Sequence, residues 1–88
     1  MTRTAFEADL CPGTEAPRMR FNFPNGWTAS ILLRQLARHG PCNFDAAAIA
    51  AWPTGQHGQG KTEIVETEAG ADEIATFLAE VARREPIA

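Results

Sequence analysis

Apolar and polar residues alternate on both sides of a tight turn in the first half of the chain. The apolar positions are Met19, Phe21, Phe23, Trp27, Ala29, Ile31 and Leu33. A period of two is typical of a β-strand that buries one face. The pattern therefore predicts a β-hairpin with strands at residues 18–23 and 27–33.

The three residues between these strands, Pro-Asn-Gly at 24–26, are suited to a type I turn closed by a bulge. Proline sets the negative φ of the first position, and glycine accepts the left-handed third position. This loop pairs Phe21 with Ala29 and Met19 with Ile31. A two-residue Asn-Gly loop would mix polar and apolar residues on both faces, so we expect the three-residue register.

Two further segments are candidate strands. Residues 44–52 are rich in alanine, which favours a helix that Asn43 would cap. However, Phe44 and Trp52 end a run in which small apolar residues recur at every second position, and a hairpin needs at least a third strand for stability. We therefore favour a strand at 44–52, with helix as the alternative. Residues 62–66 form a short, charged segment typical of an edge strand.

The clearest helix is predicted at residues 71–84. Acidic residues at 72–73 begin it and two arginines at 83–84 end it, an arrangement that complements the helix dipole. Its apolar stripe follows the spacing i, i+3, i+4, i+7 and consists of Ile74, Phe77, Leu78 and Val81. We expect this stripe to pack on the apolar face of the hairpin.

Together these elements predict an α+β fold with a small antiparallel sheet of three to four strands and one C-terminal helix on one face. Two prolines and a glycine between residues 11 and 17 argue against a regular element there. We therefore interpret residues 1–17 as a flexible N-terminal tail and residues 18–88 as a single domain. The start of the chain has no continuous apolar segment typical of a signal peptide, and no stretch is long enough to span a membrane as a helix. A cytoplasmic location is therefore expected.

The net charge of −3 over 88 residues conceals a division of charge along the chain. Every charged residue between 17 and 44 is an arginine, and every charged residue from 62 to 80 is an acid. Such asymmetry predicts two electrostatically distinct surfaces. With the helix on the other face, the outer face of the hairpin is predicted to be basic and partly apolar. The candidate partner-binding residues are Arg18, Arg20, Leu32, Arg34, Arg38 and Lys61.

Two motifs suggest chemistry that their context does not support. Residues 55–62 match the phosphate-loop pattern G-x-x-x-x-G-K-[ST], but a phosphate loop opens a long helix, and Gly70 lies too close downstream for one. Cys11, Cys42, His39 and His57 are potential zinc ligands, but they lack the two tight ligand pairs typical of structural zinc sites. We therefore expect no cofactor, no metal and no enzymatic activity.

The chain also resembles small phage and prophage proteins. The residues that carry the resemblance are Phe23, Asn25, Gly26, Trp27, Ser30 and Ile31, followed by the small-residue strand 46–52 and the closing helix 73–81. Some phage proteins of this build are anti-CRISPR inhibitors. The resemblance implies a non-enzymatic protein that binds a host defence nucleoprotein complex. We expect the chain to be a monomer or a weak dimer. The alternative is a small nucleic-acid-binding regulator that uses the basic hairpin face.

Overall fold

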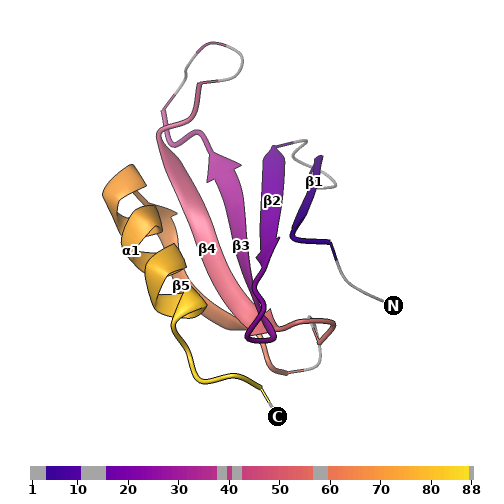
Figure 1. The fold of residues 1–88 in the computed structure, drawn as a ribbon. Helices are drawn as coiled ribbons and strands as arrows, with labels where there is room; N and C mark the ends of the chain where they lie inside the picture. The colour runs from indigo at the N-terminus through magenta and orange to yellow at the C-terminus, as the bar shows by residue number, and fades with distance from the viewer. Residues whose placement is uncertain (1–3, 11–15, 38–39, 41–42, 57–59, 88) are drawn as a thin grey trace.

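The structure is a computed structural model that describes residues 4–10, 16–37, 40, 43–56 and 60–87. The described part contains a five-stranded antiparallel sheet and one helix (Figure 1). The elements are β1 (Phe6–Leu10), β2 (Pro17–Asn22), β3 (Trp27–Arg34), β4 (Ala46–Pro53), β5 (Glu63–Ala69) and α1 (Ala71–Ala82). The strand order β1-β2-β3-β4-β5 follows the chain, so each strand lies beside its neighbours in sequence.

The predicted hairpin register is confirmed. Phe21 lies opposite Ala29 and Met19 lies opposite Ile31, and the Phe23 N–H donates to the carbonyl oxygen of Trp27 at 2.9 Å. Gly26 has a φ of 90°, the left-handed conformation that the three-residue loop requires. The apolar side chains of β2 and β3 therefore share one face of the sheet.

The first strand was not predicted, and the interpretation of residues 1–17 as a flexible tail is wrong for its central part. Phe6–Leu10 form β1, which pairs antiparallel with β2 so that Phe6 lies opposite Phe21 and Leu10 lies opposite Pro17. The two phenylalanine rings meet edge to face, with centroids 5.3 Å apart. Residues 1–3 and 11–15 lie outside the described residues.

The alanine-rich segment is a strand, as we favoured, and not the alternative helix. β4 lies between β3 and β5, and its residues Ala47 and Ala51 are completely buried on the face that carries Ile49. Burial on both faces accounts for the alanines, because small side chains let neighbouring layers approach the strand closely.

The helix is shorter than predicted at its C-terminal end. It stops at Ala82, and the backbone N–H groups of Arg83 and Arg84 bond to carbonyls three residues earlier, at 3.2 Å each. The two arginines therefore lie beyond the last turn. At the other end, the Glu73 carboxylate accepts a bond of 3.1 Å from the Gly70 N–H and so caps the first turn.

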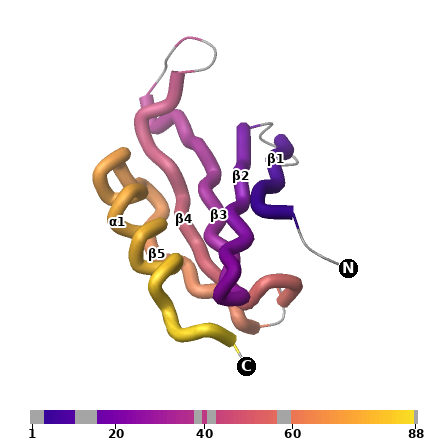
Figure 2. Tube along the Cα trace, viewed as in Figure 1, coloured from indigo at the N-terminus to yellow at the C-terminus, as the bar shows by residue number. Residues whose placement is uncertain are grey.

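The predicted stripe of α1 packs on the sheet, but it covers only part of the face. The helix lies against β3 and β4, and the buried Phe77 and Val81 join a core that includes Ala29, Ile49 and Ala51. Figures 1 and 2 show β1 and β2 toward the edge of the sheet that lies away from α1. Five strands at about 4.8 Å spacing are wider than one helix of about 10 Å diameter. The expected burial of Met19 under the helix is therefore wrong, since Met19 is 42% exposed.

Candidate functional site

The predicted basic surface lies on the sheet face opposite α1, but it is neither fully exposed nor purely basic. Arg18, Arg20, Leu32 and Arg34 are half-buried there. Ser30 on the same face is buried among the strands. Lys61 is exposed just before β5, away from these four in sequence, and Arg38 lies outside the described residues.

β1 supplies carboxylates to the arginines of this face. Asp9 lies opposite Arg18 in the register, and the guanidinium of Arg18 donates two bonds to its carboxylate, at 2.9 Å from Nε and 2.7 Å from Nη2. Arg20 lies 4.0 Å from the same carboxylate. The hydrogen bond from Arg18 lowers the pKa of Asp9 below its usual value, and the charges of Arg18 and Arg20 add to this effect. Much of the predicted positive charge is thus neutralised within the molecule.

A second acid of β1 begins a chain of polar contacts. The Asn22 side-chain amide donates to the Glu7 carboxylate at 2.7 Å, and the Thr28 hydroxyl donates to the side-chain oxygen Oδ1 of Asn22 at 2.7 Å. Thr28 also shares a bond of 2.8 Å with the hydroxyl of Thr54. Thr28 is only 1% exposed, so these bonds satisfy a buried hydroxyl and serve the fold rather than a ligand.

The remaining arginine of the hairpin is also engaged. The Arg34 guanidinium donates to the Thr67 carbonyl of β5 at 2.8 Å. Because this bond reaches from β3 to β5, it ties the far edge of the sheet to its centre. The four predicted side chains of the hairpin face are thus brought onto one surface, but three of them hold strands together.

Many acidic residues lie on α1 and on β5, the edge strand at the opposite side of the sheet from β1. Six carboxylates come from β5 and α1, and we call this surface the acidic flank: Glu63, Glu66, Glu68, Asp72, Glu73 and Glu80. All six are exposed. A cleft of about 420 Å³ runs between β5 and α1, with carboxylates at its rim and the buried Ile49 and Phe77 in its lining.

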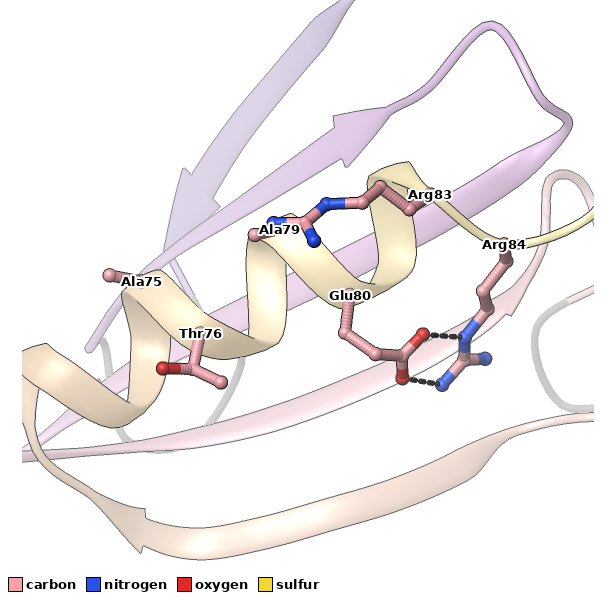
Figure 3. A pocket seen from close by; sticks show the side chains of 6 residues that line it. All are labelled: Ala75, Thr76, Ala79, Glu80, Arg83 and Arg84. Atoms are coloured by element: carbon pink, nitrogen blue, oxygen red, sulfur yellow. Dashed lines mark hydrogen bonds and ion pairs between the residues drawn. The ribbon is translucent and has the colours of Figure 1, made fainter.

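Arg84 is the base that folds back against the acidic flank. Its guanidinium donates two bonds of 2.6 Å to the Glu80 carboxylate, drawn in Figure 3, and bonds of 3.1 and 3.2 Å to Glu63. The guanidinium also lies 4.6 Å from the centroid of the Trp27 ring. Among the described residues, no ion pair reaches Glu66, Glu68 or Asp72. These three carboxylates therefore keep their charge available at the surface.

The bonds between Arg84 and Glu80 should make the stability of the fold depend on pH in the acid range. The hydrogen bond from Arg84 lowers the pKa of Glu80 below its ordinary value of 4.5. A carboxyl group with a lowered pKa in the folded state stabilises the fold at pH values above its ordinary pKa. This stabilisation is lost as the pH falls through the folded-state pKa. We expect the free energy of unfolding to fall between about pH 5 and pH 3. Urea unfolding at a series of pH values should show a shallower acid decline for Glu80→Gln. An unchanged slope would contradict this role.

The metal and phosphate motifs of the sequence find little support among the residues that the structure describes. They contain no group of three or more His, Cys, Asp and Glu side chains able to hold a metal ion. The phosphate-loop match is followed by β5 instead of a helix, so the loop lacks the helix that binds phosphates. The four potential zinc ligands, Cys11, Cys42, His39 and His57, all lie outside the described residues. The described residues contain no helix long and apolar enough to cross a membrane.

Comparison of the chain with protein-family models, with curated proteins and with solved structures finds no match.

Proposed function

We propose that this chain is a small non-enzymatic protein that inhibits a host defence nucleoprotein complex, in the manner of an anti-CRISPR protein. The acidic flank is the proposed contact surface. The observation that supports this assignment most is the distribution of charge. The arginines of the hairpin are engaged by Asp9 and by the Thr67 carbonyl, whereas Glu66, Glu68 and Asp72 are exposed on β5 and α1. Glu7 and Asp9 of β1 offset most of the arginine charge on the hairpin face, so the larger net charge at the surface is the negative charge of the acidic flank.

The cleft between β5 and α1 suits basic side chains. Lysine and arginine combine a long apolar stem with a charged end. The lining of the cleft offers Phe77 and Val65 to the stem and Glu66 and Asp72 to the charged end. Guanidinium groups in particular bind carboxylates through two parallel bonds. A surface rich in lysine and arginine is thus the complement of the acidic flank.

Surfaces rich in lysine and arginine occur where proteins bind nucleic acid, because the positive side chains neutralise the phosphates. The carboxylates of β5 and α1 can compete with phosphates for such a basic surface. The long range of the electrostatic attraction speeds the encounter of the two proteins. The resemblance to phage proteins directs the test to CRISPR effectors. The alternative, direct binding of nucleic acid by the hairpin face, is less favoured because Asp9 neutralises Arg18 and the chain carries net negative charge.

The test is competition with target DNA. Purified guide-loaded CRISPR effectors of several types are mixed with a fluorescent target duplex, and anisotropy reports the bound fraction. We expect the protein to weaken duplex binding at least tenfold for a susceptible effector. The triple variant Glu66→Gln/Glu68→Gln/Asp72→Asn should lose at least nine-tenths of this inhibition, because the neutral amides keep the size of the side chains and remove the charge.

Glu85→Gln is the matched control, since the Glu85 side chain is exposed outside the acidic flank and only its backbone carbonyl bonds to Trp27. It should inhibit like the unmodified protein. Equal inhibition by the triple variant would remove the acidic flank from the proposal. Tight binding of the labelled duplex by this protein alone, falling steeply between about 50 and 200 mM salt, would support the nucleic-acid-binding alternative instead.

A further inference from the structure

The sheet face that carries α1 is apolar from β1 to β4, but the helix covers only one side of it. The uncovered side, here called the open half-face, belongs to β1 and β2 and consists of Phe6, Ala8, Leu10, Pro17, Met19 and Phe21. Phe6 is 64% exposed and Leu10 is 60% exposed. Contiguous exposed apolar surface of this kind marks an interaction site.

The open half-face is continuous with the core. Met19 lies opposite Ile31, and Ile31 lies opposite Ile49 beneath the helix. An apolar hollow of about 210 Å³ opens where the two halves meet, between Met19, Phe21 and Leu33. On this face α1 forms the layer above the sheet, and the hollow lies where that layer stops. No other described element lies next to α1 on that side.

The flank of α1 that borders the open half-face is made of alanine. Helical spacing places Ala71, Ala75, Ala79 and Ala82 on one side of the helix. Figure 3 shows Ala75 and Ala79 on the side of β3 and β2, whereas Glu80 is directed toward β5. Such short side chains leave space beside the helix, so another layer can approach α1 closely.

The charges around this surface favour a second copy of the chain as its occupant. No charged side chain of β1 or β2 belongs to the open half-face, because Glu7, Asp9, Arg18 and Arg20 alternate onto the other face. Asp9 and Arg18 are the charged residues among those that line the hollow, and they form an ion pair that is neutral as a unit. A basic or acidic partner gains nothing here, whereas two neutral apolar faces match each other. The acidic flank lies at the opposite edge of the sheet, so two copies keep their negative charges apart.

We propose that the protein forms a symmetric dimer in which the open half-faces of two copies pack on each other. Two sheets pack face to face at about 10 Å, which is also the space that a helix occupies on a sheet. β1 and β2 of one copy can therefore occupy the same layer as α1 of the other copy, next to the alanine flank of that helix. The same residues serve both copies, as twofold symmetry requires. This dimer does not depend on the proposed function.

The size of the surface sets the expected affinity. The open half-face measures roughly 17 Å along the strands and about 10 Å across β1 and β2. The alanine flank adds a strip of similar length. The total is well below the roughly 800 Å² per copy that stable interfaces bury. We therefore expect a weak, concentration-dependent dimer with a Kd in the high micromolar range.

Sedimentation equilibrium from about 1 µM to 1 mM tests the dimer. The average mass should rise toward twice that of the chain. Leu10→Glu and Met19→Glu should each raise the Kd at least tenfold, because each places a charge within the apolar contact. Ile64→Glu is the matched control, since Ile64 is 70% exposed on β5, outside the open half-face. It should leave the Kd unchanged. Circular dichroism melting checks that each variant is folded.

Isotope-filtered NOE spectra of a mixed labelled and unlabelled sample test the geometry. The Met19 methyl group of one copy should show contacts to aromatic protons of the other. The proposal is overturned by a chain that stays monomeric up to 1 mM. It is also overturned by a dimer that Ile64→Glu weakens and Leu10→Glu does not. A dimer without intermolecular contacts from Met19, as edge-to-edge pairing of β1 would give, overturns it as well.

Discussion

Replacing Phe77 with alanine is expected to lower the free energy of unfolding by about 3–5 kcal/mol. Phe77 is 5% exposed and is the largest side chain that α1 buries in the core. Its neighbours Ala29, Ala47 and Ala51 are too small to fill the space that the ring would leave. The substitution therefore loses both the burial of the ring and the packing around it. Small domains have only about 5–15 kcal/mol of stability, so this variant should lose a large part of its folded population.

Urea unfolding followed by circular dichroism measures this change. Thr76→Ala is the neighbouring control, because Thr76 is exposed on the same turn of the helix. It should change the free energy of unfolding by less than about 0.5 kcal/mol. A loss below about 1 kcal/mol for Phe77→Ala would show that α1 contributes little to the core and would undermine the described packing.

Replacing Asn25 with alanine is expected to cost about 2–3 kcal/mol, a large effect for a residue in a surface turn. The Asn25 amide donates to the carbonyls of Val81 at 2.9 Å and Arg84 at 3.2 Å, so it satisfies the end of α1. Its side-chain oxygen accepts from the Trp27 N–H at 3.1 Å and shapes the turn. The loss of this one side chain leaves the Val81 carbonyl with only the longer bond from the Arg84 N–H and removes the donor to the Arg84 carbonyl, and it loosens the hairpin.

Asn25→Asp separates the two roles. The carboxylate keeps an acceptor for Trp27 but cannot donate to the helix carbonyls, and its charge is unfavourable at the negative end of the helix dipole. We expect it to be at least as destabilising as Asn25→Ala, again by urea unfolding. If Asn25→Asp is as stable as the unmodified protein, the contacts between turn and helix do not contribute to the fold.

The residues after α1 extend the same contact. The Ile87 N–H donates to the Asn25 carbonyl at 2.9 Å, and the Trp27 indole donates to the Glu85 carbonyl at 3.3 Å. Figure 2 shows this C-terminal segment passing beside the turn between β2 and β3. The turn that closes the hairpin is thus also the place where the end of the chain is fastened.

The candidate sites differ in how far they could be predicted. The acidic flank follows from an uninterrupted run of acids in two consecutive elements, so charge patterning was enough to find it. The basic hairpin face was predicted from Arg18 and Arg20, and its neutralisation was missed because Asp9 lies in a segment interpreted as a tail. A signal for β1 was present, since Phe6, Ala8 and Leu10 alternate with Glu7 and Asp9. Five residues near two prolines are too short for a confident local assignment.

By itself, the sequence determined the hairpin register and the stripe of α1, and it favoured over a helix the strand at 44–52 that the structure has at Ala46–Pro53. These features depend on turn geometry and on periodicity among residues that are near each other in the chain. Only the tertiary structure decided that β1 joins the sheet and that Asp9 binds Arg18. It alone also placed the helix over β3 and β4, which leaves β1 and β2 uncovered. These outcomes depend on contacts between segments that are distant in the chain. Because one helix is narrower than the sheet, the position of α1 on the sheet is set by the packing of the whole molecule.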